Sequence, residues 1–278
     1  MRYRRSVRGS HKFIGPRSKE PLPHRATVQS SKRDSANHAT MCGRFRLTRS
    51  QKAIAQQFDA ELLAALNDFE DLPRINIAPT QQVVAVKQGK GRFRIVTRMR
   101  WGLIPVWAKD ASIGNRNINA RSDRIREIAS FRDLISSRRC LIPADGFYEW
   151  QKSGKIKQPY CFEVVEGEGL FAFAGLWDSW KDPHGEIVES CTILTTTPNE
   201  LVARLHDRMP VIVPREKYEK WLDPDIEDYE AIRDIFDPYD ATKMREYPAN
   251  PKLNNAKNED MSLAGPVEAI EPEQGGLF

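Results

Sequence analysis

Apolar and polar positions alternate through the middle of the chain, which is the pattern of half-buried β-strands. Residues 93–99 show this pattern most clearly, with arginines among the positions of the opposite face. The alternating face comprises Phe93, Ile95, Thr97 and Met99. A glycine-containing turn separates this strand from another predicted at residues 83–86. Other short apolar runs predict further strands at residues 139–143, 160–165, 170–174, 191–196 and 211–213.

Helical spacing is confined to short segments. Thr48 and Gln51 fit a capping box, and the following apolar positions recur at helical intervals, namely Ile54, Phe58 and Leu62. Ser122 is a candidate cap for a second helix, with Ile125, Ile128 and Ile135 on its inner face. Pro198, after Thr197 as cap, predicts the first turn of a short helix. Two more helices are predicted at residues 215–222 and 226–236.

Many short strands without a βαβ alternation predict one α+β domain over residues 41–258. Curved, mostly antiparallel, barrel-like sheets flanked by short helices would bury so many short strands. Residues 1–40 lack hydrophobic periodicity and are predicted to form a disordered basic leader. Residues 259–278 are predicted to form a flexible tail, and residues 74–80 a loop.

The net charge of +5 is unevenly distributed along the chain. Residues 1–40 contain ten Lys and Arg against two acidic residues, and residues 87–139 contain fourteen against four. Residues 216–278 contain seven against sixteen. A basic region inside the domain favours an anionic partner such as nucleic acid, and the alternative is a solvated charged face.

The cysteines predict neither disulfides nor a metal site. The four are far apart, contain no CxxC pair, and have no metal-site spacing with the five histidines: Cys42, Cys140, Cys161 and Cys191. Cys161 and Cys191 lie among apolar residues, which is typical of small core side chains. No apolar run reaches the roughly 18–20 residues of a membrane span. These features favour a reducing, cytoplasmic compartment.

The Met41-Cys42 pair gives the chain a possible reactive terminus. If translation starts at Met41, its removal leaves Cys42 with an α-amine beside a thiol, because Met aminopeptidases act when the next side chain is small. Such a 1,2-aminothiol condenses with an aldehyde to a thiazolidine. The α-amine has a reference pKa of about 7.7–8.0, so a useful fraction is neutral and nucleophilic at cellular pH.

The forty residues before Met41 bear on this chemistry. They resemble a transit peptide in composition, or a basic arm for DNA. A third interpretation is that Met41 is the true start. We favour the third, because it frees the amine of Cys42 without a protease, and we expect the functional chain to begin at Cys42.

Several other residues could contribute chemistry, although each has a structural alternative. Glu149 lies between aromatic residues, where a carboxylate becomes a usable acid or base, or it alternates out to solvent on a strand edge. His206 either carries protons or interacts with a helix end or Asp207. Asn76 and Asn119 could hold ligand oxygens or form turns.

Arginines and aromatic residues could bind a nucleic acid. Arg44 and Arg121 could clamp phosphates, and Trp107 could stack on a base as in single-strand binders. Aromatic residues beside proline are more often core residues.

Taken together, all of these candidate residues except Trp107 fall in six ordered motifs. The motifs are Met-Cys-Gly-Arg-Phe at 41–45, Asn-Ile-Ala-Pro-Thr at 76–80, Trp-Gly-Leu-Ile-Pro at 101–105, Asn-Ala-Arg-Ser at 119–122, Asp-Gly-Phe-Tyr-Glu-Trp at 145–150 and His-Asp-Arg-Met-Pro at 206–210. Over residues 41–258 the chain resembles the SOS response-associated peptidase (SRAP) family, whose members shield abasic sites in single-stranded DNA. Residues 255–258 resemble the closing motif of that family.

The resemblance implies a role for each matching residue. Cys42 corresponds to the residue that crosslinks to the abasic-site aldehyde, and Glu149 to the acid/base of imine formation and ring closure. His206 corresponds to the residue that helps to open the deoxyribose ring, and Asn119 to an orienting residue. The expected contacts to DNA are Arg44, Asn76, Trp107 and Arg121.

The resemblance also implies a DNA damage response role, an autopeptidase activity that matures the N-terminus, and lyase-like chemistry. We expect a monomer that needs no cofactor or metal, binds single-stranded DNA rather than a membrane, and associates with the nucleoid. Two other classes remain open. One is a cysteine hydrolase using Cys42, Glu149 and His206, and the other is a DNA-binding module without chemistry.

Overall fold

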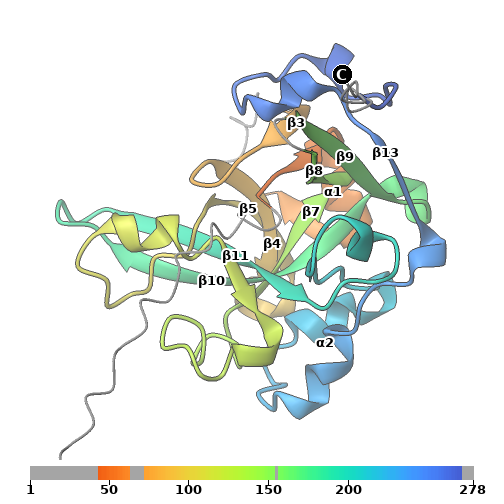
Figure 1. The fold of residues 1–278 in the computed structure, drawn as a ribbon. Helices are drawn as coiled ribbons and strands as arrows, with labels where there is room; N and C mark the ends of the chain where they lie inside the picture. Colours follow the sequence, from red (N-terminus) through yellow and green to blue (C-terminus); the bar gives the residue numbers. More distant parts are fainter. Residues whose placement is uncertain (1–42, 63–71, 154–155, 271–278) are drawn as a thin grey trace, which may run out of the picture. The chain divides into compact units, whose positions relative to one another are not determined.

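Two β-sheets position the candidate residues in the computed structural model, which describes residues 43–62, 72–153 and 156–270. The larger sheet contains a closed barrel of five strands (Figure 1). Its strands are β4 (Gln82–Gln88), β5 (Arg94–Trp101), β7 (Arg139–Ala144), β10 (Phe171–Lys181) and β11 (Ile187–Thr196). The first four pair antiparallel with their neighbours, and a parallel pairing of β11 with β5 closes the circle. The predicted α+β fold with barrel-like sheets is thus confirmed.

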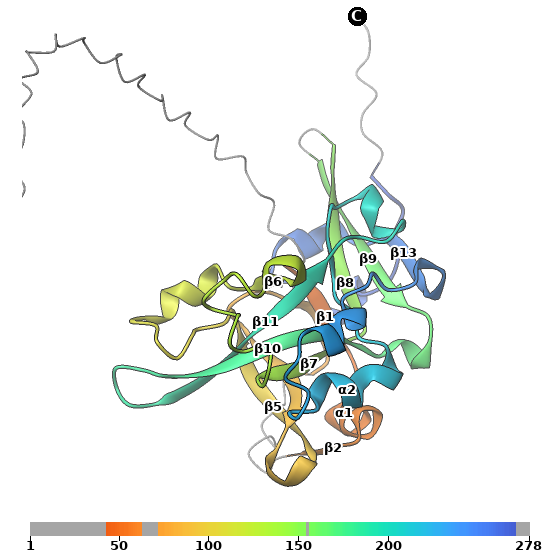
Figure 2. The same cartoon turned by 90° about the horizontal axis from the view of Figure 1, so that it is seen from below.

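Three short strands extend this sheet: β2 (Ala60–Leu62), β6 (Asn119–Arg121) and β12 (Met209–Pro210). Strand β2 pairs with β5, whereas β6 and β12 both pair with the last residues of β11. The hairpin formed by β10 and β11 projects beyond the barrel in both views (Figure 1 and Figure 2). The end of β11 thereby becomes a meeting point for two distant parts of the chain.

The second sheet brings the start and the end of the domain together. Its strand order is β13-β9-β8-β1-β3. The strands are β1 (Phe45–Leu47), β3 (Arg74–Ile77), β8 (Gly146–Ser153), β9 (Ile156–Val164) and β13 (Met244–Pro248). Residues 74–80 were predicted to form a loop, but β3 occupies the first four of them. This strand pairs with β1, and a distant carboxylate satisfies two of its amides, Ile75 and Asn76.

Aromatic side chains join the two sheets. Phe45 of β1 lies edge-on to Trp101 of β5 (ring centroids 5.2 Å apart) and to Phe173 of β10 (5.7 Å). All three are at most 2% exposed, and burying each stabilises the fold by roughly 2–3 kcal/mol. The strand that leads from Cys42 is therefore anchored in the main core.

A group of charges around the buried Glu163 carboxylate, which we call the Glu163 cluster, joins strands of the second sheet. Arg46 contacts Asp145 at 3.0 Å and Glu163, whose carboxylate also accepts from Tyr247 (2.6 Å) and Arg245 (2.6 Å). Burial raises the pKa of Glu163, but the Tyr247 hydroxyl and the two arginines outweigh it and leave the pKa lowered. The cluster links β1, β9 and β13 to the turn before β8 through charge-assisted hydrogen bonds.

Two α-helices occur among the described residues: α1 (Gln51–Phe58) and α2 (Tyr218–Leu222). The cap of α1 is Ser50, which accepts from the Ala53 amide, and not the predicted Thr48. Thr48 instead donates its hydroxyl to Asp145 (2.7 Å). Leu62 was predicted on this helix but belongs to β2, because Asp59 adopts a left-handed conformation that ends the helix.

The segment after Ser122 was predicted to be a helix and forms a short 3-10 helix, Ser122–Arg124, followed by turns. Its inner face was predicted correctly, because Ile125 and Ile135 are buried. Arg139 donates to the carbonyls of Ile135 and Ser136, so these groups are satisfied without a continued helix.

Three further predictions differ from the structure in the second half of the chain. Residues after Pro198 form a 3-10 helix, Val202–Arg204, because Asn199 caps the Val202 amide. Residues 226–236 likewise contain a 3-10 helix, Glu230–Ile235. Residues 211–213 form one bridge with Phe173 rather than a strand.

The described cysteines are structural. Cys140, Cys161 and Cys191 are fully buried and free, which confirms the prediction for the last two. No group of His, Cys, Asp and Glu within the described ranges has the arrangement of a metal site. None of the helices in this part of the chain is long and apolar enough to span a bilayer.

Residues 259–270 were predicted to belong to a flexible tail, yet they contact the second sheet. Glu259 pairs with Arg74, Leu263 is buried, and the Val267 amide donates to the Pro248 carbonyl. These contacts extend the packed part of the chain to Ile270. The leader, residues 1–40, and the end of the tail, residues 271–278, lie outside the described residues.

Candidate catalytic and DNA-binding site

Glu149 lies on β8 beside the point where the chain enters the second sheet. The Tyr148 amide donates to the Arg44 carbonyl (3.0 Å), and Phe147 pairs with Phe45. The residues before Phe45 therefore run towards Glu149. Its side chain is 3% exposed, so the alternative that it alternates out to solvent is wrong. Cys42 itself lies outside the described residues, one peptide bond before Gly43.

Asn119 and His206 both lie on segments held by the end of β11. Asn119 begins β6, which runs parallel to β11 with Asn119 opposite Ile193. His206 lies three residues before β12, which pairs antiparallel with the end of β11 at Thr195 and Thr196. The two side chains are far apart in the sequence, and the end of one strand holds both of their segments.

The Nδ1 atom of His206 has two contacts that belong to different protonation states. It accepts the Arg208 amide at 3.1 Å, and it lies 3.0 Å from a carboxylate oxygen of Asp207. A neutral ring accepts the amide and carries its proton on Nε2, whereas a charged ring donates to Asp207. Asp207 is 89% exposed, so water competes for its carboxylate. The Arg208 amide therefore helps to orient the His206 ring.

Arg208 and Asp123 form part of this site, although the sequence reasoning did not single them out. Arg208 is buried and donates to the Thr195 hydroxyl (3.2 Å), and it pairs with Asp123 (3.1 Å). Its Nε atom is buried without a hydrogen-bond partner among the described residues. Both residues stand in or directly after quoted motifs, so the motif positions were the available signal.

Asp123 also holds Arg121 through two hydrogen bonds of 3.2 and 2.7 Å. The hydrogen bond from Arg121 is the main cause that lowers the pKa of Asp123 to about 2, and the charge of Arg208 adds to it against partial burial. Arg121 is half exposed, so its guanidinium is oriented by one carboxylate while it still faces solvent. Two arginines beside Asn119 and His206 are suited to hold a phosphate.

Arg44 directly precedes β1, and Asn76 lies on β3, which pairs with β1 on the edge opposite β8. Arg44 donates to the side-chain Oδ1 atom of Asn76 (2.6 Å), and the Arg44 guanidinium lies 5.8 Å from the ring centroid of Trp150. Burial lowers the pKa of Arg44, although the charge of Glu259 opposes this effect. Asn76 is fully buried. That Arg44 and Asn76 contact DNA stays a prediction.

Trp107 is presented to solvent by a rigid loop after β5. It is 57% exposed, and its neighbour Val106 is anchored because its amide donates to Asp178 (2.8 Å). Gly102 has φ +126°, and a Cβ on Gly114 would lie 2.5 Å from the Gly102 carbonyl oxygen. Only glycines allow this close approach, which fixes the base of the loop. An exposed indole on a fixed loop is suited to stacking on a base.

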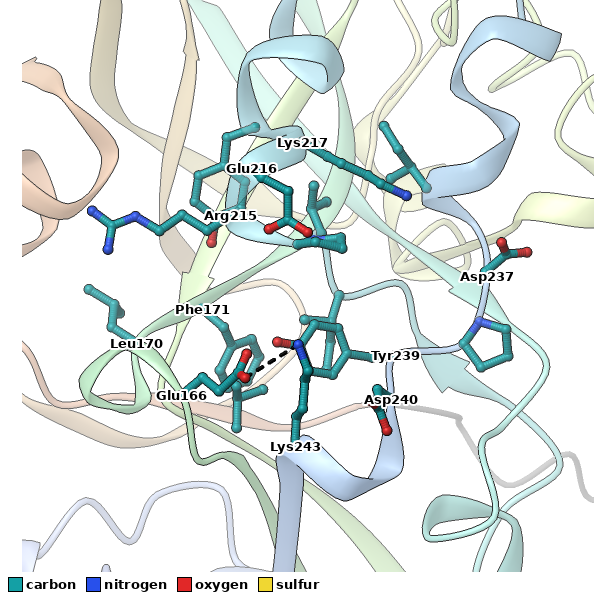
Figure 3. Close-up of a pocket in the computed structure, with 18 of the residues that line it drawn as sticks. Glu166, Leu170, Phe171, Arg215, Glu216, Lys217, Asp237, Tyr239, Asp240 and Lys243 are labelled. Carbon is teal, nitrogen blue, oxygen red and sulfur yellow. Dashed lines mark ion pairs between the residues drawn. The ribbon is translucent and has the colours of Figure 1, made fainter.

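A separate cavity of about 490 Å³ lies between the β9–β10 loop and the segment around α2 (Figure 3). Glu166 and Lys243, which both line it, form an ion pair at 3.3 Å, and a dashed line marks this pair in Figure 3. Lys217 on its wall pairs with Asp234 at 2.9 Å. None of the sequence-predicted site residues that the structure describes lines this cavity.

Comparisons with known proteins agree on one family. Residues 41–256 match the family described as SOS response associated peptidase (SRAP). The chain is 40% identical over 224 residues to the abasic site processing protein YoqW of Bacillus subtilis, covering 80% of this chain and 98% of that protein.

Two more distant matches extend this similarity. The abasic site processing protein HMCES of Gallus gallus is 32% identical, over 65% of this chain and 60% of that protein. A crystal structure of a protein from Bacteroides thetaiotaomicron superposes with a TM-score of 0.74 at 27% identity, over 82% of this chain and all of that one.

Proposed function

This chain belongs to the SOS response associated peptidase (SRAP) family, and we propose that it processes abasic sites in single-stranded DNA by a covalent crosslink through Cys42. The observation that carries the proposal is the buried Glu149 carboxylate beside the strand that leads from Cys42. A carboxylate in this position supplies the proton transfers that condensation of an amine with an aldehyde requires.

The proposed reaction forms a thiazolidine and releases one water molecule. The free α-amine of Cys42 attacks the aldehyde carbon of the open-chain deoxyribose and gives a carbinolamine. Glu149 donates a proton to the departing hydroxyl, which leaves as water and gives an imine. The Cys42 thiolate then adds to the imine carbon, and the imine nitrogen takes a proton to become the ring amine. The ring persists because it holds both heteroatoms on one carbon, whereas a bare imine hydrolyses readily.

The remaining residues would prepare the aldehyde for this attack. An abasic deoxyribose is mainly a closed hemiacetal, so a proton carrier is needed to open it, and His206 fills this role with Asn119 as orienting group. Arg121 holds a flanking phosphate, with Arg208 behind it. Trp107 stacks on a neighbouring base, and Arg44 completes the proposed DNA contacts.

We also propose that the protein acts as a monomer on cytoplasmic DNA in the damage response, without a cofactor. Self-removal of residues before Cys42 would be its peptidase activity, with Cys42 as nucleophile and His206 or Glu149 as base. A precursor that starts at Met1 distinguishes this activity from external processing. The precursor should mature when it is made alone, and its Cys42→Ala variant should stay uncleaved.

The first test uses protein begun at Met41 and a single-stranded oligonucleotide with one abasic site, without reducing agent. A slow band that survives a denaturing gel is expected, and it should be absent for Cys42→Ala and for undamaged DNA. No band from protein whose Met41 is shown by mass to be removed would refute the crosslink and favour the hydrolase.

A further inference from the structure

Asn76 is occupied by the protein itself and joins β3 to residues 250–259, which we call the closing segment. Its Nδ2 atom donates to three backbone carbonyls of this segment, those of Leu253 (3.3 Å), Asn255 (2.9 Å) and Asn258 (3.1 Å). Its Oδ1 atom accepts from Arg44. Two amide hydrogens directed at three carbonyls leave no donor for a DNA phosphate.

The closing segment also contacts the strand that leads from Cys42. Arg44 donates from Nη1 to the Leu253 carbonyl (3.0 Å) as well as to Asn76. Leu253 is 1% exposed and packs with Ile75 and Tyr148 in a small second core. The turn at Leu253 therefore accepts a hydrogen bond from the Arg44 side chain and also packs against Ile75 and Tyr148.

The same segment reaches the strand of Glu149 through an exposed side chain. Asn254 accepts from the indole nitrogen of Trp150, the residue after Glu149, at 2.6 Å. Its amide nitrogen donates to the Lys157 carbonyl at 3.0 Å on the adjacent strand β9. Asn254 thus ties the hairpin that carries Glu149 to the same turn that holds Arg44.

Glu259 fixes the far end of the segment. Its carboxylate accepts the amides of Ile75 (2.9 Å) and Asn76 (3.0 Å) and pairs with Arg74 (3.2 Å). Figure 1 shows this C-terminal part of the chain in blue beside the orange β3. The segment is therefore held at both ends against the sheet that contains β1 and β8.

We propose that the closing segment is a positioning element that sets the nucleophile strand against Glu149, acting through Asn76 and Asn254 rather than by touching DNA. The inference rests on the proposed function. Attack on an aldehyde needs the amine and the carboxylate in register, and a misplacement of about 1 Å can slow a reaction by about 100-fold. The contacts above connect the neighbours of both groups to one rigid turn.

The test compares variants of one exposed side chain. In Asn254→Ala the Trp150 indole loses its acceptor, whereas Asn254→Asp retains an oxygen for it. Thr242→Ala is the control, because its side chain is also exposed and uncharged and its hydroxyl donates to Asp240 (2.7 Å) outside the closing segment. For each variant begun at Met41, we would measure the crosslinking rate at saturating abasic DNA and the Kd for the undamaged oligonucleotide.

We expect Asn254→Ala to lower the saturating rate about tenfold and leave the Kd within about twofold. Asn254→Asp should restore most of the rate, and Thr242→Ala should match the unsubstituted protein. Asn76→Asp retains the acceptor for Arg44 but removes the donors, so it should lower the rate further, by about 10- to 100-fold. Its melting temperature shows whether it folds, and the exposed Asn254 variants decide the question if it does not.

Two results would overturn the inference while the proposed function stands. One is an unchanged saturating rate in Asn254→Ala and in folded Asn76→Asp. The other is a weakened Kd with an unchanged saturating rate, which would make the closing segment a DNA contact. Failure of the unsubstituted protein to crosslink would refute the proposed function and this inference with it.

Discussion

Replacing Asp123 by Asn removes the one carboxylate that Arg121 and Arg208 share, while side-chain size is retained. We expect two opposite effects from this substitution. The folded protein becomes less stable, because a buried arginine loses its counter-charge. The affinity for undamaged single-stranded DNA increases, because a negative charge beside the phosphate site is lost.

The effect on stability follows from the pKa of Asp123, which is lowered from 3.8 to about 2. A shift of this size corresponds to about 2.5 kcal/mol in the absence of solvent screening. The side chain is 50% exposed, and screening reduces the expected loss to about 1 kcal/mol. Because the folded pKa is depressed, this contribution is fully present above about pH 4 and is lost as the pH falls towards 2.

The effect on DNA binding follows from the repulsion between the Asp123 carboxylate and a DNA phosphate. When both bind opposite edges of the Arg121 guanidinium, the two anions are about 7 Å apart. At effective dielectric constants of about 40–80, their repulsion is about 0.6–1.2 kcal/mol. Removing it should tighten the Kd about three- to eightfold and make the salt dependence steeper by about 0.7 for a single strand. Fluorescence anisotropy with an undamaged oligonucleotide, repeated at several salt concentrations, measures both quantities.

The control is Asp133→Asn, because Asp133 also pairs with a neighbouring arginine, Arg132 (3.0 Å), away from the site. It should change neither the Kd nor the salt dependence. A weaker affinity in Asp123→Asn would refute the electrostatic reasoning, since the carboxylate would then act mainly by orienting the two arginines.

Three further predictions follow from burial and exposure. Glu163→Gln should lower the free energy of unfolding by about 3 kcal/mol, because Arg46 and Arg245 lose a buried counter-charge. Urea denaturation should show that the stabilisation by Glu163 is lost as the pH falls below about 4.5, and equal stability of both proteins at pH 7 would contradict this prediction. Trp107→Ala should weaken binding of undamaged single-stranded DNA by about 1–3 kcal/mol with an unchanged melting temperature, and Val106→Ala is its control. A thiol reagent should label one cysteine per native chain begun at Met41 and four after unfolding, because burial raises the thiol pKa of the other three, Cys140, Cys161 and Cys191, and labelling of more than one native cysteine would contradict it.

Much of the fold could be predicted because its strands carry local patterns. The alternation at residues 93–99 and the buried run at 139–143 correspond to β5 and β7. Helical spacing was less reliable, since Ile125 and Ile135 are buried as predicted while their backbone forms turns. Distant partners, such as Arg139 on nearby carbonyls, determine that backbone and leave no periodic signal.

The site could be predicted only in part, for the same reason. Ordered motifs pointed to Glu149, Asn119 and His206 as candidates, but no spacing reveals that the segments of the last two both pack against β11. The position of Arg208 depends on the carboxylate of Asp123, which lies 85 positions earlier in the sequence. Sequence patterns name the residues, whereas the pairing of distant strands decides which of them meet.

Barrel closure by β5 and β11 gives the assembly of the site a definite order in time. The barrel cannot close until the ribosome has made Cys191, which pairs with Trp101, and the closing segment follows more than fifty residues later. At about 5–20 residues per second, the interval between synthesis of Cys42 and synthesis of Glu259 is roughly 10–45 s. Throughout that interval Arg44 lacks the hydrogen bond that it donates to the closing segment in the folded domain. In a chain begun at Met41, we therefore expect processing enzymes at the ribosome to reach Met41 before β1 is packed in the complete domain.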